Sequence, residues 1–323
     1  MNKLLLSLAT AAVMPLVALA QTAWPDKPVT VVVPFGAGGG VDAAARIVMP
    51  KLAERLGQQL IIENVPGASG TIGTQRVAKG KPDGTTLLFA VASPINVAPL
   101  VAPSTVRYDA LKDLAPIAPV AVSPFVLVGR PGLPAANTAE LLALARKQPG
   151  KLTYGTDGFG TSLHVTAAMI TATAGVDILH VPYKSGPQVL TDVAGGQVDL
   201  GVLPVALVQG MVKEGKVKAY GVTSKARTDA LPGVPSLSET PALATLDVES
   251  WMGLLGPAGL DPAIVARLNK EVAAVLADPA VQKQLADGGM KPMQMAPADF
   301  GAYLAKERKA LAAVVAANNI KAE

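Results

Sequence analysis

The sequence predicts an α/β fold made of two doubly wound lobes, and three observations lead to this prediction. Segments with the composition of buried strands alternate with loops and helices through the first half of the chain. The first such strand has five β-branched residues at 29–33. Glycine-rich loops lead from these strands into helices, as in a parallel sheet. The same strand, loop and helix design returns at 151–173 with little residue identity to the first copy. We therefore expect two lobes of this kind that face each other.

The first 20 residues are predicted to be an export signal rather than part of the fold. Lys3 supplies the positive charge, an apolar run follows, and Ala18-Leu19-Ala20 forms an Ala-x-Ala cleavage site, so we expect cleavage after Ala20. A membrane anchor is the weaker alternative, because Pro15 interrupts the apolar run. The chain has no cysteine, which excludes a lipid-modified N-terminus and disulfides. The prediction is a periplasmic mature protein that begins at Gln21.

Composition and charge exclude several classes of function. With 50% hydrophobic residues in 323, the chain can build two sizeable cores. The net charge of +4 comes without a Lys/Arg run or an aromatic ladder, so we expect no nucleic-acid partner, whereas a small anionic ligand fits. Two histidines and no cysteine make a metal site improbable, and we expect no cofactor. The 5 Phe, 5 Tyr and 2 Trp are few for a sugar cleft, which stacks rings on its ligand.

The first loop has four glycines within residues 36–40 and leads into a helix. A dinucleotide fingerprint fails because Val41 stands where the third glycine is needed, and no lysine follows to make a P-loop. Two alternatives stay open: a tight turn without a ligand, or capture of a carboxylate by backbone N–H groups at a helix N-terminus. We expect Asp42 to be the N-cap of this helix, which continues through Leu52 and ends before Gly57.

The rest of the first half repeats this alternation. We expect strands at 59–63 and 85–90, loops at 66–73 and 91–96, and a short helix at 74–78. Loops that follow parallel strands meet at one edge of the sheet, where open α/β sheets bind ligands. Ser93 and Asn96 would bring side-chain hydrogen-bonding groups to that edge.

A second α/β unit is predicted from Ile117, followed by a return to the first. We expect strands at 117–128, 151–154 and 218–222 and helices that begin at Thr138 as N-cap and at 205. A further helix follows the loop at 155–164 and continues through Met169 to Thr173. His180 is expected to begin a strand between the lobes and to have no ligand role. An apolar strand at 246–255 would cross back to the first lobe, and three helices, at 261–276, 279–286 and 297–318, would complete its packing.

Six motifs, in order and spacing, resemble one known family over nearly the whole mature chain. They are Val33-Pro34-Phe35-Gly36-Ala37-Gly38-Gly39-Gly40-Val41-Asp42, Glu63-Asn64-Val65-Pro66-Gly67-Ala68-Ser69-Gly70, Lys81-Pro82-Asp83-Gly84, His180-Val181-Pro182-Tyr183-Lys184, Gly195-Gly196-Gln197-Val198-Asp199-Leu200 and Pro257-Ala258-Gly259. The chain is similar to the Bug-type extracytoplasmic solute receptors of tripartite tricarboxylate transporters. Each motif alone is weak, and the six in order are specific.

The resemblance implies a type II periplasmic-binding-protein fold, with a ligand cleft between two α/β lobes. It also implies binding of a small carboxylate-bearing ligand and its delivery to membrane transporter subunits, by a monomer that is not an enzyme. The expected division is a signal peptide at 1–20, lobe one at 21–120 plus 248–323, and lobe two at 121–247. We expect hinges near 118–124 and 245–250.

Three departures from the family pattern concern recognition of the ligand. Val41 replaces the usual Thr or Ser beside the first loop, and 201–204 is apolar where a polar or acidic residue often stands. Asp157 stands where a small residue or proline is more common. If Asp157 faces the cleft, its charge repels a second carboxylate and favours an ammonium or hydroxyl group. The alternative is that Asp157 is only a turn residue.

The expected ligand contacts come from loops of both lobes. They are Phe35, Gly36, Ala37, Gly38, Gly39, Asp42, Gly67, Ala68, Ser69, Thr71, Ser93, Asn96, Thr156, Asp157, Gly158, Phe159, Thr161, Ser162, His164 and Leu203. Two other functions stay open. A sensor that docks a signalling partner differs from a transport receptor only in that partner, and a secreted hydrolase would need a nucleophile and base. Ser162 and His164 are two residues apart on a helix and point apart, without a Gly-x-Ser-x-Gly elbow.

Overall fold

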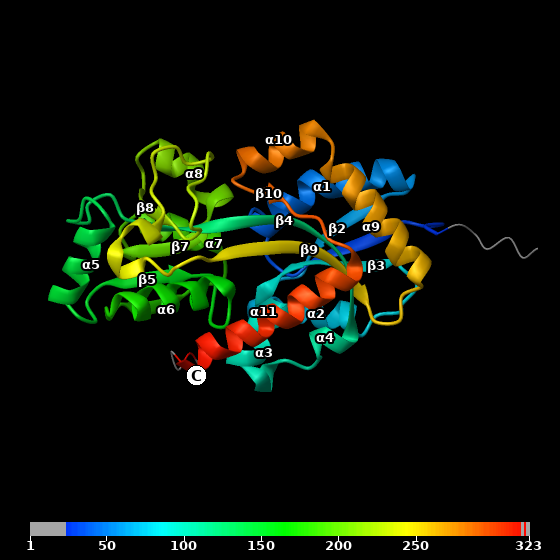
Figure 1. The fold of residues 1–323 in the computed structure, drawn as a ribbon, viewed down its shortest axis with the longest axis horizontal. Coiled ribbons are helices and arrows are strands. Elements are labelled where there is room, and N and C mark those ends of the chain that lie inside the picture. The colour runs from blue at the N-terminus through cyan, green and yellow to red at the C-terminus, as the bar shows by residue number, and fades with distance from the viewer. Residues whose placement is uncertain (1–23, 318–319, 321–323) are drawn as a thin grey trace, which may run out of the picture.

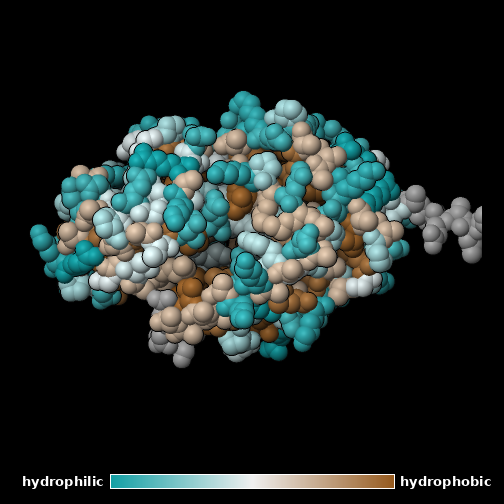
Figure 2. Space-filling model, in the orientation of Figure 1, coloured by the Kyte–Doolittle hydropathy of each residue, from teal (hydrophilic) through white to brown (hydrophobic). Residues whose placement is uncertain are grey.

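The computed structural model describes residues 24–317 and residue 320, so the predicted export signal lies outside the described residues. Two α/β lobes lie side by side along the long axis, the strand β4 (Leu114–Gly129) runs through both of them, and β9 (Glu249–Pro257) pairs with its lobe-one part (Figure 1). Among the described residues, no helix combines the length and the apolar character needed to span a bilayer. Hydrophobic residues reach the face drawn in Figure 2 only in small, separated patches.

The strands form one extended sheet in the order β2-β1-β3-β9-β4-β7-β5-β6, with β8 and β10 also paired to β4. Pairing is parallel at the two ends of this order, as predicted, and antiparallel wherever β4 or β9 takes part. The remaining strands are β1 Val29–Val33, β2 Leu60–Asn64, β3 Thr86–Val91, β5 Thr153–Thr156, β6 Leu179–Pro182, β7 Leu200–Pro204, β8 Lys218–Val222 and β10 Lys291–Pro292. The prediction of a strand between the lobes at His180 was wrong, because β6 ends the sheet order in lobe two.

The strand β4 links the lobes. Its first part, Leu114 to Pro124, pairs with β9, and Phe125 to Gly129 pair with β7 and β8 in the second lobe. The register against β9 shifts after Pro116 and again after Pro119, and a proline has no N–H to donate to a ladder. The predicted strand at 117–128 therefore exists, but it belongs to both lobes rather than opening the second one.

The predicted helices are present in the predicted order, with corrected N-termini, and the structure adds a helix at 186–194 that was not predicted. The longer ones are α1 Gly40–Leu56, α2 Thr71–Ala78, α5 Thr138–Lys147, α6 Ser162–Ala174, α7 Gly186–Ala194, α8 Val205–Lys213, α9 Pro262–Leu276, α10 Pro279–Asp287 and α11 Pro297–Ala317, and short helical turns are α3 Ala98–Val101 and α4 Ala110–Asp113. Gly39 caps α1, so the prediction of Asp42 as N-cap was wrong. The N-cap of α5 is Asn137, one residue before the predicted Thr138.

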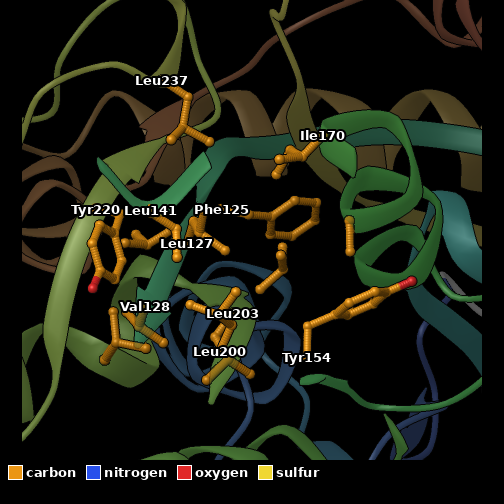
Figure 3. Close-up of a cluster of buried hydrophobic side chains, with 14 of the residues drawn as sticks. Phe125, Leu127, Val128, Leu141, Tyr154, Ile170, Leu200, Leu203, Tyr220 and Leu237 are labelled. Atoms are coloured by element: carbon orange, nitrogen blue, oxygen red, sulfur yellow. The ribbon is translucent and has the colours of Figure 1, made fainter. Parts of the chain in front are cut away.

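Each lobe has its own hydrophobic interior. In lobe one, successive residues of β1 point to opposite faces of the sheet: Val31 packs with α1, α9 and α10, and Val32 packs with α2 and α11. In lobe two, a single cluster joins Phe125, Tyr154 and Tyr220 with the helices α5 to α8 (Figure 3). The strand β4 contributes to both interiors, with Ile117 to Ala121 in lobe one and Phe125 to Val128 in lobe two, which supports the predicted two-lobe arrangement.

Candidate functional site

A cleft of about 580 Å³ lies between the lobes. Its walls are the loops that follow β1, β2 and β3 in lobe one and β5, β6 and β7 in lobe two. These are the carboxyl ends of the parallel strands, the edge where open α/β sheets bind ligands. The floor is formed by β4 and β9 where they cross between the lobes, through Ser123, Phe125, Ser250 and Met252.

Helix N-termini from both lobes open into this cleft. The helices α1, α6 and α7 begin at Gly40, Ser162 and Gly186, and all three residues line it. Inside α1 the first backbone bond is donated by Ala43 to the Gly39 carbonyl at 2.9 Å, so the N–H groups before Ala43 have no partner within the helix. Such N–H groups and the helix dipoles attract an anion without a charged side chain.

The lining contains two charged side chains, Asp157 and Lys184. Lys184 is exposed, whereas Oδ1 of Asp157 is buried and has no hydrogen-bond partner. Burial is the main influence on Asp157 and raises its pKa to about 6. The Thr161 side chain has a smaller, opposing effect. An acidic group in this position repels a second anionic group of a ligand unless it takes up a proton.

The lobe-two loop at 156–162 rests on two stacked imidazoles. The rings of His164 and His180 have centroids 4.3 Å apart, and Phe159 meets both edge-on. His164 Nδ1 accepts the Gly160 N–H at 3.3 Å, and His180 Nε2 lies 2.7 Å from the Thr156 hydroxyl. Burial lowers the pKa of His164 to about 4 and that of His180 to about 3, the latter also through the neighbouring His164, so both rings are neutral at pH 7. Their role is to support the loop.

Hydrogen bonds join the two lobes across the cleft. The Ser69 hydroxyl of lobe one donates to the Phe159 carbonyl of lobe two. Ser93 Oγ accepts the Ser162 N–H at 2.8 Å and lies 3.0 Å from the Ser162 hydroxyl. Ser162 is therefore engaged with the opposite lobe, and His164 with its own loop, rather than with each other as a nucleophile and base would be.

Eleven of the twenty predicted contact residues line the cleft. They are Phe35, Gly36, Gly39, Gly67, Ala68, Ser69, Ser93, Asp157, Gly158, Phe159 and Ser162. The other nine lie outside the lining: Ala37, Gly38, Asp42, Thr71, Asn96, Thr156, Thr161, His164 and Leu203. Most of these nine residues make contacts that hold the cleft loops in place without lining the cleft themselves. Asp42, for example, accepts the Gly38 N–H at 2.9 Å and the side chains of Arg46 and Asn64 at 2.9 and 3.0 Å.

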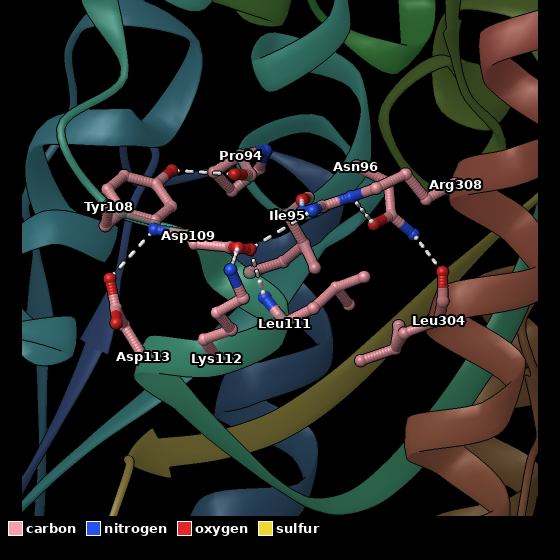
Figure 4. A network of polar contacts seen from close by, with 10 residues as sticks. All are labelled: Pro94, Ile95, Asn96, Tyr108, Asp109, Leu111, Lys112, Asp113, Leu304 and Arg308. Atoms are coloured by element: carbon pink, nitrogen blue, oxygen red, sulfur yellow. Dashed lines mark hydrogen bonds and ion pairs between the residues drawn. The ribbon is translucent and has the colours of Figure 1, made fainter.

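Asn96 has a different role from the predicted one. Its amide donates to the Leu304 carbonyl at 2.9 Å and to Glu307 at 2.6 Å, and its oxygen accepts from Arg308 at 3.2 Å. It therefore connects the end of β3 to α11, within a polar network that also includes Asp109 (Figure 4). Its position after β3 correctly placed Asn96 near the cleft edge of the sheet. The sequence did not show that its side chain points toward α11 instead of into the cleft.

Sequence reasoning missed the loop from Tyr183 to Pro187 and the floor of the cleft. This loop was predictable, because it follows a predicted strand and precedes a helix, as do the loops that were predicted to bind the ligand. The floor residues on β4 and β9 carry no local signal, since their position depends on pairing between strands more than 100 residues apart in the chain.

Comparisons with known proteins identify relatives over almost the whole chain. The family model TctC, described as "Tripartite tricarboxylate transporter family receptor", matches residues 44–320. A "UPF0065 protein in tcbD-tcbE intergenic region" of Pseudomonas sp. (strain P51) is 37% identical over 279 residues, which cover 85% of this chain and 81% of the relative.

Three solved structures are similar in sequence and in fold. "R. palustris Rpa4515 with adipate" is 30% identical, with a TM-score of 0.89, covering 92% of this chain and 99% of that one. "Periplasmic binding protein BugD" is 31% identical, with a TM-score of 0.87 and coverages of 93% and 100%. MatC from Rhodopseudomonas palustris "with bound malate" is 31% identical, with a TM-score of 0.85 and coverages of 90% and 100%.

Proposed function

The chain belongs to the tripartite tricarboxylate transporter receptor family, and we propose that it is a periplasmic receptor that captures a small carboxylate-bearing ligand between its lobes and delivers it to a membrane transporter. One observation carries this proposal: the N-termini of α1, α6 and α7, from both lobes, open into one cleft with only two charged side chains. An anion is held there by backbone dipoles. The relatives whose structures contain adipate and malate bind carboxylates in proteins of the same fold.

In this proposal the loops at 36–41 and 66–70 hold the carboxylate on lobe one, through backbone N–H groups. The loop at 157–162 and the start of α7 engage it when the lobes close, with hinges near 118–124 and 245–250. The lobes comprise 21–120 plus 248–323 and 121–247. The protein acts as a monomer, is exported by cleavage after Ala20, and has no catalytic step, because Ser162 and His164 have other partners.

Glycine-to-valine substitutions test the cleft directly. Gly39 has an ordinary negative φ, and a Cβ there meets only the Gly36 carbonyl at 3.7 Å, so valine adds bulk at the cleft without straining the backbone. Gly38 is unsuitable because its φ is +82°, so that valine would strain the loop. Gly210 on α8 is the matched control, since a Cβ there meets nothing within 4 Å and Gly210 is outside the lining.

Native mass spectrometry of the protein purified without denaturation would first identify its co-purified ligand. Calorimetry with that ligand should then show loss of binding for Gly39→Val and full binding for Gly210→Val. Thermal unfolding of ligand-free Gly39→Val should fall only slightly, because valine is a poorer N-cap than glycine. Full binding by Gly39→Val would remove this loop from the site and contradict the proposal.

A further inference from the structure

On the basis of the proposed function, we infer that this cleft is specific for a monocarboxylate whose body carries an aromatic ring and a hydrogen-bond donor that pairs with Asp157. The inference names the class of ligand for the proposed site. It rests on the side chains that remain in the lining once the backbone N–H groups have taken the carboxylate.

Aromatic rings are concentrated at the cleft. The chain has 5 Phe, 5 Tyr and 2 Trp in 323 residues, yet Phe35, Phe125, Phe159 and Tyr183 all line this one cavity. They come from lobe one, the floor, and two different loops of lobe two. The remaining lining combines aliphatic side chains, such as Leu207 and Met252, with six serines whose hydroxyls can hydrogen-bond a polar group of the ligand. A volume of about 580 Å³ with such walls suits an apolar body of ring size.

Phe159 is held in place for such a ligand. Its ring meets His180 edge-on at 4.7 Å and His164 at 5.3 Å, and the two imidazoles are stacked on each other. Although the ring rests on this support, Phe159 is 41% exposed and lines the cleft. An aromatic side chain that is fixed on one side and open on the other offers a surface on which a ligand ring can pack.

The negative charge of Asp157 disfavours a second carboxylate at its end of the cleft. Oδ1 of Asp157 is buried without a partner, and a buried carboxylate oxygen without a hydrogen bond is costly. That oxygen has no surface open to the cleft, so the ligand meets the part of Asp157 that lines the cleft. A hydroxyl or ammonium group of the ligand there offsets the poor solvation of the carboxylate, whereas a second carboxylate is repelled. Lys184 is exposed to solvent, so its charge is screened and can attract the ligand from solution. It is not a buried cation that would bind a second anionic group of the ligand.

Four probes separate the parts of this inference. Benzoate has a ring and one carboxylate, 4-hydroxybenzoate adds a donor, terephthalate adds a second carboxylate, and adipate has two carboxylates and no ring. Calorimetry on the mature protein, freed of co-purified ligand, should give the tightest binding for 4-hydroxybenzoate, followed by benzoate. Tighter binding of adipate or terephthalate than of both monocarboxylates would overturn the inference while the proposed function stands. Absence of binding by all four, together with no co-purified carboxylate, would overturn the proposed function itself.

Two variants test the residues that carry the inference. Phe159→Leu keeps an apolar side chain and removes the ring, so affinity for both ring monocarboxylates should fall by about two- to tenfold. Asp157→Asn should weaken 4-hydroxybenzoate by about tenfold and strengthen terephthalate, because hydrogen bonds to charged groups are the stronger ones. Asp177→Asn, at an exposed position before β6 and outside the lining, is the matched control and should change neither. Unchanged affinities in both cleft variants would overturn the inference.

Discussion

At the scale of single residues, the loop at 156–162 places titratable groups with opposite pH responses next to each other. The pKa of Asp157 is raised by burial to about 6, and those of His164 and His180 are lowered to about 4 and about 3. Between about pH 6 and 4 the folded state therefore binds more protons than the unfolded state at Asp157, and fewer at the histidines. Acidification in this range stabilises the fold through Asp157 and destabilises it through the two imidazoles.

Replacing Asp157 should expose the histidine contribution. Between pH 7 and pH 4, Asp157→Asn should lose on the order of 3 kcal/mol more of its free energy of unfolding than the wild type, because the stabilising protonation of Asp157 is gone. Urea unfolding followed by circular dichroism at several pH values measures this difference. Asp177→Asn should follow the wild type throughout. Parallel curves for the wild type and Asp157→Asn would show that Asp157 is not desolvated in the folded protein.

The residues of the site differ in how far the sequence predicts them. The residues of the first loop that line the cleft, such as Gly36 and Gly39, were predictable because strand, glycine and helix are encoded locally. The direction of Asn96 was not, since it depends on Glu307 and Arg308 more than 200 positions away. His164 and His180 form a stack that no spacing in the chain reveals.

At the scale of elements, two loops meet across the cleft through serines. Ser93 follows β3 of lobe one, and Ser162 begins α6 of lobe two. The Ser162 N–H, one of the groups at the start of α6 that have no partner within the helix, donates to Ser93 Oγ at 2.8 Å. The lobe-one serine thus accepts one of the N–H groups at the start of α6, which stabilises the arrangement in which the lobes are together.

Removing that hydroxyl should weaken the closed arrangement without unfolding either lobe. For Ser93→Ala we expect ligand affinity to fall at least about fivefold, because the change removes both contacts of this hydroxyl with Ser162 and closure contributes to binding. Calorimetry with the co-purified ligand measures this change, and thermal unfolding of the ligand-free protein should shift little. Ser238→Ala, on the outer Leu237–Glu239 turn of lobe two, provides a serine control. Affinity equal to the wild type would mean that the contact does not assist closure.

For the strand β4, the sequence predicted the strand itself but not its partners in the sheet. Its apolar composition predicted a strand, but its pairing with β9 in one lobe and with β7 and β8 in the other could not be read from the chain. Antiparallel crossing strands look like any buried strand in sequence, because both faces are covered. The repeated strand, loop and helix design at 151–173 and the family resemblance together predicted the two lobes that β4 joins.

At the scale of the whole molecule, function requires that the lobes separate to admit a ligand and come together around it. Figure 1 shows β4 and β9 as the strands that pass between them, so a relative movement of the lobes would bend these two strands. Away from the strands, α3 of lobe one approaches the lobe-two loop. A Cβ placed on Gly160 would lie 3.7 Å from the Cβ of Val101, within the range of a disulfide.

A cross-link at this point should lock the lobes together. The chain has no cysteine, so in Val101→Cys/Gly160→Cys the engineered pair can form only one intramolecular bridge. Gly160 has a φ of +68°, so a side chain there costs about 1–2 kcal/mol, which the fold should tolerate. Oxidation of the ligand-loaded protein should slow ligand release by at least tenfold, because the closed lobes cannot separate, and a reductant should restore the original rate. Stopped-flow displacement measures that rate, with Val101→Cys alone as the control. Equal release rates in the oxidised and reduced double variant would show that ligand leaves without separation of the lobes, and the closing mechanism would be wrong.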